Sequence, residues 1–175
     1  MDRISISKGD IVRMKIEAIV NASNTSLLGG GGVASSIQKY AGDEYMQACI
    51  ALGGCNTGEA KITPGFKLNA KYVIHTAGPI WRGGNKGEPE LLKNCYDNCL
   101  DLAVKNHIKS IAFPSISTGV YRYPVELAIK IALKEIITFL KVHPELEKVV
   151  IVCNDERTTR LYKNYLKKIE TQNLF

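Results

Sequence analysis

The sequence lacks several features that would assign it to particular protein classes. No run of about 18 apolar residues occurs, which excludes a membrane-spanning helix. The first residues, Met-Asp-Arg-Ile-Ser, are not a basic segment followed by an apolar run, so we expect no secretory signal and a cytoplasmic location. The five cysteines are an odd number without a Cys-x-x-Cys pair, which favours reduced thiols over a disulfide framework. The three histidines are not at ligand spacing from the cysteines, so we expect no metal.

Neither sign of charge dominates the composition, and no repeat or low-complexity tract interrupts it. Of 175 residues, 23 are Lys or Arg and 17 are Asp or Glu, which gives a formal net charge of +6. Hydrophobic residues make up 45% and charged residues 23%, a balance that predicts one globular domain over residues 1–175. A charge of +6 is compatible with a phosphate-rich partner but also serves solubility, so nucleic-acid binding is the weakest hypothesis.

Short β-branched runs alternate with longer segments of helical period. The expected strands are 4–7, 18–20, 60–63, 72–76, 110–116 and 149–152, and Pro114 is expected to break the fifth of them. The expected helices are 33–40, 44–52, 88–106, 124–140 and 156–169. This alternation predicts an α/β fold, a three-layer α/β/α sandwich with a central mixed, mainly parallel sheet. Ligands of such sheets bind outside the carboxyl ends of the strands, so polar and glycine-rich segments at strand ends are candidate sites.

The strongest candidate follows the second expected strand. Asn21-Ala22-Ser23-Asn24 precedes Leu27-Leu28 and four consecutive glycines, residues 29–32, which lead into a helix. Glycine permits close backbone approach, and a helix start offers unpaired N–H donors at the positive end of its dipole. A flexible loop without a ligand is the alternative, but ordering four glycines costs much backbone entropy. We therefore favour a cradle for an anionic group such as a pyrophosphate. The Gly-Lys-Ser/Thr of a Walker loop and the dinucleotide fingerprint are both missing.

Two further strand ends carry weaker signals. Residues 114–124, Pro-Ser-Ile-Ser-Thr-Gly-Val-Tyr-Arg-Tyr-Pro, run from a strand into a helix. Their amides and hydroxyls could close on the other side of a diphosphate, with Tyr121 over a sugar, although many such turns use Ser, Thr and Gly. Asp10, after the first strand, could cap a helix or accept a hydrogen bond from the exocyclic amine of adenine. His75, at a strand end, is interpreted as a core histidine bonded to the backbone.

Together these segments resemble the macrodomain family. The matching segments, in the family's order, are Gly9 to Ile11, Ala18 to Asn24, Leu28 to Val33, His75 to Trp81, and Phe113 to Tyr121. These segments span nearly the whole chain. The MacroD-type branch of the family is the one most closely resembled, in the leucine pair before the glycines and in the segment Gly-Pro-Ile-Trp. The resemblance implies ADP-ribose binding, removal of mono-ADP-ribose from acidic side chains of proteins, and deacetylation of O-acetyl-ADP-ribose. We further expect a monomer, no cofactor and no membrane partner.

The resemblance also implies a role for particular residues. Asp10 would bind the adenine amino group, supported by the backbone of Ile11, and Asn24 would hydrogen-bond the distal ribose. Tyr121 would lie near that ribose. The residues implied to line the diphosphate are Gly31, Gly32 and Val33 on one side and Ser117, Thr118, Gly119, Val120 and Tyr121 on the other. The strand end at Cys153 and Asn154 would border the adenine.

One residue departs from the pattern. The MacroD-type branch commonly has an aspartate after the glycines and valine, where this chain has Ala34. That aspartate is proposed to assist the attacking water, and an alanine can neither take a proton nor orient water. Either the substrate's own phosphate holds the water, as in viral and archaeal relatives with alanine, or the alanine is a substitution that traps ligand. The implied catalytic positions are Asn24, Ala34 and Tyr121. A reader module that binds ADP-ribose without turnover is the alternative function.

Overall fold

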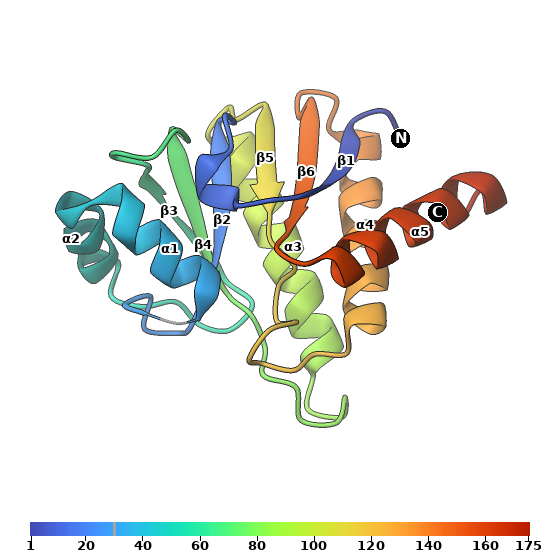
Figure 1. Ribbon diagram of the computed structural model, residues 1–175, viewed down its shortest axis with the longest axis horizontal. Coiled ribbons are helices and arrows are strands. Elements are labelled where there is room, and N and C mark those ends of the chain that lie inside the picture. The colour runs from blue at the N-terminus through green and yellow to red at the C-terminus, as the bar shows by residue number, and fades with distance from the viewer. Residues whose placement is uncertain (30) are drawn as a thin grey trace.

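The computed structural model describes residues 1–29 and 31–175, in which a twisted sheet is covered by helices on both faces (Figure 1). Gly30, one of the four glycines in the predicted cradle, lies outside the described residues. The strands are β1 (Ile4–Lys8), β2 (Ala18–Ser23), β3 (Ala60–Pro64), β4 (Tyr72–Ala77), β5 (Ser110–Phe113) and β6 (Lys148–Cys153). They form one sheet in the order β1-β6-β5-β2-β4-β3, in which only the edge strand β3 is antiparallel to its neighbour. The predicted mixed, mainly parallel sheet is therefore confirmed.

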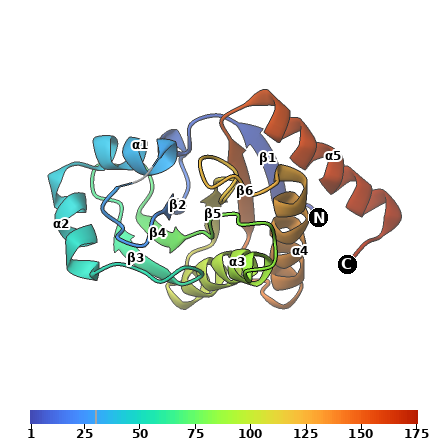
Figure 2. The same ribbon diagram turned by 90° about the horizontal axis from the view of Figure 1, so that it is seen from below.

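The helices divide between the two faces of the sheet (Figure 2). They are the 3-10 helix η1 (Ile11–Arg13), α1 (Gly32–Ala41), α2 (Asp43–Leu52), α3 (Glu88–Lys105), α4 (Val125–Val142) and α5 (Glu156–Gln172). Residues of η1, α1 and α2 form one core with Ile19, Val73 and Val150 of the strands. Residues of α3, α4 and α5 form the other core with the alternate strand positions, such as Val20 and Ile74. This three-layer arrangement confirms the expected sandwich.

The two buried faces explain why the central strands are apolar at successive positions. In β6, Val149, Val150, Ile151 and Val152 are all buried because their side chains alternate between the two helical layers. Some boundaries differ from the sequence-based expectation. Strand β2 continues through Ser23, because it pairs with β4 over its whole length. Strand β5 ends at Phe113, since Pro114 has no N–H to donate to a ladder.

The arrangement of the parallel strands positions the candidate site. Strands β1, β6, β5, β2 and β4 run in one direction, so their carboxyl ends lie at the same edge of the sheet. The residues that follow these ends are Gly9, Asn154, Pro114, Asn24 and Gly78. Segments far apart in sequence therefore meet at one edge. Within the described part of the chain, no helix is both long and apolar enough to cross a membrane.

Candidate functional site

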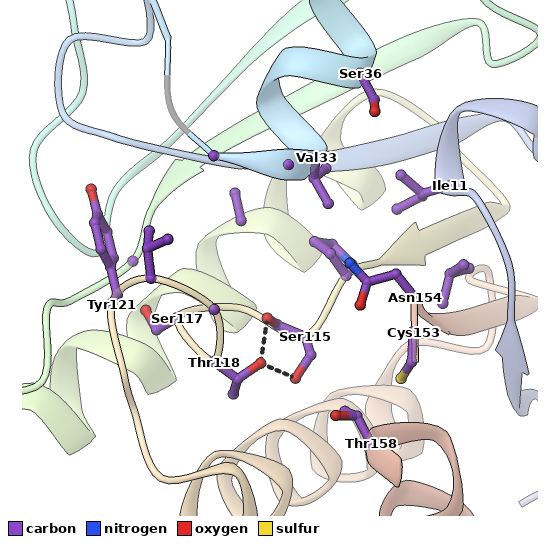
Figure 3. Close-up of a pocket in the computed structure, with 18 of the residues that line it drawn as sticks. Ile11, Val33, Ser36, Ser115, Ser117, Thr118, Tyr121, Cys153, Asn154 and Thr158 are labelled. Carbon is purple, nitrogen blue, oxygen red and sulfur yellow. Dashed lines mark hydrogen bonds between the residues drawn. The ribbon is translucent and has the colours of Figure 1, made fainter. Parts of the chain in front are cut away.

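A cleft of about 890 Å³ runs along the carboxyl edge of the parallel strands (Figure 3). Every residue that the sequence predicts to contact a ligand lines this cleft: Asp10, Ile11, Asn24, Gly31, Gly32, Val33, Ser117, Thr118, Gly119, Val120, Tyr121, Cys153 and Asn154. Ala34 does not line it and is buried within α1. Tyr121 and Ser117 lie at one end of the cleft, and Ile11, Cys153 and Asn154 lie at the other (Figure 3). The sequence analysis did not single out Ser36, Asp155 and Thr158, which also line the cleft, and it included Gly78 and Ser115 only within longer segments.

The first loop, between β2 and α1, is held in place by hydrogen bonds at both sides. The Ser23 hydroxyl donates to the carbonyl oxygen of Gly29 at 3.1 Å, and the Cys55 N–H donates to that of Thr25 at 2.8 Å. Helix α1 begins at Gly32 with Gly31 as N-cap, and no side chain caps it. The first N–H groups of a helix have no partner within the helix, so those of Gly32 and Val33 are available to a ligand in the cleft.

The side chain of Asn24 is oriented by its own loop. The Ser26 hydroxyl donates to Asn24 Oδ1 at 2.7 Å, and the Leu27 N–H donates to the Asn24 carbonyl at 3.2 Å. The Asn24 amide nitrogen has no protein partner among the described residues and lies at the cleft. Asn24 therefore offers an oriented N–H donor, which suits a sugar hydroxyl.

The second loop, between β5 and α4, folds back on itself. The Tyr123 N–H donates to the Ser117 carbonyl at 2.9 Å, and the Arg122 N–H donates to that of Gly119 at 3.0 Å. The Thr118 hydroxyl donates to Ser115 Oγ at 2.8 Å (Figure 3). These bonds fix the conformation of the loop, in which Ser117 has a positive φ of 66°. Because such a backbone is disfavoured for a residue with a Cβ, it identifies Ser117 as a strained position at the site.

The Ser117 hydroxyl is buried, and it has no hydrogen-bond partner in the described structure. It packs so tightly against Gly78 that a Cβ on Gly78 would overlap its oxygen. Gly78 thus allows the β4 strand end to approach the second loop. A buried polar group without a partner costs free energy. Since Ser117 lines the cleft, a ligand there could supply the missing partner.

The two loops face each other across the cleft. A Cβ at Gly31 would lie 3.8 Å from Cγ2 of Val120, so the first loop comes within side-chain reach of the second. Asp10 and Asp155 are the only charged residues among the described residues that line the cleft, and these include no lysine or arginine. An anionic ligand held between the loops would therefore be bound by main-chain N–H groups rather than by cations.

At the far end of the cleft, Asp10 caps η1 as one of the two sequence interpretations expected. Its Oδ1 accepts the Val12 N–H at 3.2 Å, and its Oδ2 lies 3.8 Å from Arg13 Nε. Because Asp10 also lines the cleft, Oδ2 can still accept from a ligand. Asp155 similarly caps α5, and the Thr158 N–H that donates to its Oδ1 at 2.7 Å keeps the pKa of that carboxyl below its usual value.

The thiol of Cys153 is not suited to nucleophilic chemistry. Burial raises its pKa to about 11, so the protonated form dominates near neutral pH. All five cysteines are buried and free. In the described ranges, no three His, Cys, Asp or Glu side chains gather to form a possible metal site.

His75 lies behind the site, in a buried polar cluster. Asn21 Nδ2 donates to His75 Nδ1 at 3.2 Å, so the imidazole carries its proton on Nε2, which donates to Thr63 Oγ1 at 2.8 Å. Asn21 Nδ2 also lies 3.3 Å from the Tyr45 hydroxyl. Burial lowers the pKa of His75 to about 4. The expectation of a core histidine is confirmed, but its partners are side chains rather than the backbone.

A second cavity, of about 520 Å³, adjoins the Tyr121 end of the cleft. Gly78 and Tyr121 line both spaces. The other residues that line the second cavity are Thr25, Thr57, Pro79, Ile80, Arg82, Lys86, Glu88 and Leu91. The sequence did not predict it, because its residues come from four separate segments.

Similarity to known proteins identifies the family. The model of the family described as Macro domain matches residues 20–132. A macro domain-containing protein of Chlorobaculum tepidum is 53% identical, over 91% of this chain and 92% of that protein. An O-acetyl-ADP-ribose deacetylase of Salmonella newport is 50% identical, over 94% of each chain. The chain therefore belongs to the macro domain family.

Solved structures agree in fold. The macrodomain of Oceanobacillus iheyensis, in a glycine-to-valine variant with ADPR, superimposes with a TM-score of 0.90 and 43% identity, over 95% of this chain and 92% of that chain. Two further variants of the same protein replace an asparagine and an aspartate by alanine. The three altered positions of that protein are separated by seven and by three residues.

Proposed function

We propose that this protein binds ADP-ribose in the cleft and hydrolyses ADP-ribose esters, namely O-acetyl-ADP-ribose and mono-ADP-ribose on acidic protein side chains. The observation that carries the proposal is the pair of loops that face each other with main-chain donors in a cleft without cations. A diphosphate fits this arrangement, since it needs N–H donors on two sides. The Salmonella relative named O-acetyl-ADP-ribose deacetylase, at 50% identity, supports the activity.

The two ends of the cleft give the ligand a direction. Asp10, with a carboxylate oxygen open to the cleft, is an acceptor for the adenine amino group at one end. Asn24 and Tyr121 lie at the other end, where the distal ribose would be placed. The variants of the Oceanobacillus iheyensis macrodomain support the assignment, because Asn24, Gly31 and Ala34 have the same spacing of seven and three residues as the altered asparagine, glycine and aspartate.

The position of the hydrolytic water is part of the proposal. Two carboxylates line the cleft. Asp10 follows β1 and Asp155 follows β6, whereas Asn24, which would hold the distal ribose, follows β2. Ala34 supplies no acid or base. A phosphate oxygen of the substrate would then orient the water that adds to the ester carbonyl. The bond from the acyl carbon to the ribose oxygen breaks, one proton of the water passes to that oxygen and the other is released to solvent, and the products are a carboxylate and ADP-ribose. Asn24 and the loop backbones would hold the sugar in place.

The experiment measures turnover of both substrates. Micromolar protein is incubated with O-acetyl-ADP-ribose and, separately, with a protein mono-ADP-ribosylated on glutamate, and release of ADP-ribose is followed against buffer. Release from both is expected. If neither is hydrolysed while calorimetry shows ADP-ribose binding, the second candidate, a reader module, replaces the enzyme. Ala34 is the specific observation that favours that candidate. We also propose that the protein is a monomer, which gel filtration tests, and that it lies in the cytoplasm, which cell fractionation tests.

A further inference from the structure

The second cavity begins where the cleft ends, and the two share a wall. Gly78 and Tyr121 line both, and the Trp81 N–H donates to the Tyr121 carbonyl at 2.9 Å, which fixes the β4–α3 loop beside the second loop. In the proposed orientation the distal ribose lies at the Tyr121 end. Whatever is attached to that ribose would therefore extend toward the second cavity.

A buried carboxylate shapes this cavity. Glu88, at the start of α3, is 2% exposed and accepts hydrogen bonds from the N–H groups of Arg82 at 2.9 Å, Gly84 at 2.8 Å and Lys86 at 2.6 Å. Burial raises the pKa of Glu88, but these main-chain hydrogen bonds outweigh that effect and lower the pKa to about 2. Its negative charge is thus already bound by the backbone, and the loop between Arg82 and Lys86 is held in one conformation.

The side chains of Arg82 and Lys86 are left without a counter-ion. Both are exposed, both line the second cavity, and neither forms an ion pair or a side-chain hydrogen bond within residues 1–29 and 31–175. The cleft itself contains no lysine or arginine. Positive charge is therefore concentrated beyond the distal end of the cleft, where the ADP-ribose diphosphate would not reach. This separation points to a second, anionic ligand group.

The loops around this end also expose apolar side chains. Ile80 is 48% exposed, Val120 is 78% exposed and Leu28 is 47% exposed, one on each of three loops that border the cleft or the second cavity. Single exposed apolar residues are common, but here Ile80 lines the second cavity beside Arg82 and Lys86, and Val120 lines the adjoining cleft. The combination of apolar contacts with two cations fits a polypeptide with acidic side chains. A nucleic acid would instead favour several aromatic rings on which successive bases stack, whereas Tyr121 is the single aromatic residue among the described residues that line the second cavity.

We propose that the second cavity binds the acceptor side of the substrate, an acidic polypeptide segment whose carboxylates next to the modified residue pair with Arg82 and Lys86. This inference rests on the proposed function, since it requires ADP-ribose in the cleft. It implies that the protein recognises more of its substrate than the ADP-ribose group. O-acetyl-ADP-ribose carries an acetyl group with no free carboxylate, so it offers no charge that could pair with the two cations.

The test compares ligands by calorimetry at low salt. The probes are free ADP-ribose, a peptide that carries ADP-ribose on its central residue through a linkage that cannot be hydrolysed in place of the glutamate ester and has glutamates on both sides, and the same modified peptide with glutamines on both sides. The variant is Arg82→Gln with Lys86→Gln. Its control is Lys163→Gln with Lys167→Gln, which removes the same charge from exposed positions on α5. The acidic peptide is expected to bind about five- to tenfold more tightly than the neutral peptide. This preference should disappear in the variant and persist in the control.

Each other outcome has a defined meaning. Equal affinity of the native protein for the two peptides, with ADP-ribose still bound, overturns the inference and leaves the proposed function standing. A preference that survives in the Arg82/Lys86 variant also overturns it. Tighter binding of an ADP-ribosylated RNA end than of the acidic peptide would assign the cavity to nucleic acid instead. If free ADP-ribose does not bind, the proposed function is wrong and the inference falls with it.

Discussion

The main-chain N–H of Trp81 donates a hydrogen bond to the carbonyl oxygen of Tyr121 at 2.9 Å, which joins the loop after β4 to the loop after β5. The Trp81 ring also packs on Tyr123, with the ring centroids 4.7 Å apart. These contacts set the wall between the cleft and the second cavity. The residues on either side of that wall, Ser117 in the cleft and Arg82 in the second cavity, can therefore be tested separately.

Replacing Ser117 by alanine should weaken ADP-ribose binding without destabilising the free protein. The Ser117 hydroxyl is buried without a partner, so its removal costs the unliganded protein no hydrogen bond. If the ligand supplies that partner, affinity should fall about fivefold, the value of one neutral hydrogen bond. Calorimetry and thermal unfolding measure the two quantities. Ser117→Gly is the matched control, because it also removes the hydroxyl and relieves the positive φ. Unchanged affinity in both variants would show that the hydroxyl does not contact the ligand.

Asp10 should contribute to recognition of the base and not of the phosphates. In Asp10→Ala, the loss of a charged acceptor is expected to weaken ADP-ribose binding by about 10- to 100-fold. Binding of ribose 5-phosphate should change little, since Asp10 lies at the opposite end of the cleft from Tyr121. Asp10→Asn separates the cap from the ligand contact, because Oδ1 can still accept the Val12 N–H. Equal losses for both ligands would mean that Asp10 supports the loop instead of contacting adenine.

Local sequence was enough to predict the sheet, the helices and both loops, because their signals lie within single segments. The apolar run from Val149 to Val152 indicates a strand covered on both faces, and the glycines before Val33 indicate a close backbone approach. The role of Glu88 and the hydrogen-bond partners of His75 could not be predicted in this way. Glu88 resembles an ordinary acidic first-turn residue until the loop before α3 folds around it. The partners of His75 come from different strands, so only the tertiary structure brings them together.

The second cavity could not be predicted from local sequence either. Its lining is drawn from Thr25, Thr57, Tyr121 and the segment from Gly78 to Leu91, and no motif joins them. One signal was present in the sequence. Two glycines and a lysine precede Gly87 and Glu88. A carboxylate that follows such a loop can accept hydrogen bonds from several of its main-chain N–H groups. That signal predicts an ordered loop, but the unpaired state of Arg82 and Lys86 emerges only from the fold.

The buried His75 should make stability depend on pH in the weakly acidic range. Its pKa is lowered from 6.5 to about 4 in the fold by burial, so below pH 6.5 the unfolded chain binds a proton that the folded protein does not. Stability should be constant above about pH 6.5 and fall by about 3 kcal/mol as pH decreases to about 4. Urea unfolding at a series of pH values measures this change. His75→Gln keeps an acceptor and a donor without a titrating ring, and its stability should vary much less over that window. A variant with the native pH dependence would exclude His75 as the cause.

Ala34→Asp should raise turnover if this position acts in catalysis. Ala34 is buried in the first turn of α1, close to Val33 at the cleft, and an aspartate there would benefit from the helix dipole while paying a desolvation cost. General acid–base assistance is worth about 10²- to 10⁴-fold, so an increase of at least about tenfold in kcat for O-acetyl-ADP-ribose is expected even if the geometry is imperfect. The control is Ala34→Asn, which has nearly the same size and no carboxylate. An aspartate variant that remains folded and binds ADP-ribose normally, yet turns over no faster than the asparagine variant, would show that catalysis does not use this position. A rate above that of the native protein in the aspartate variant alone would identify the missing carboxylate as the limit on turnover.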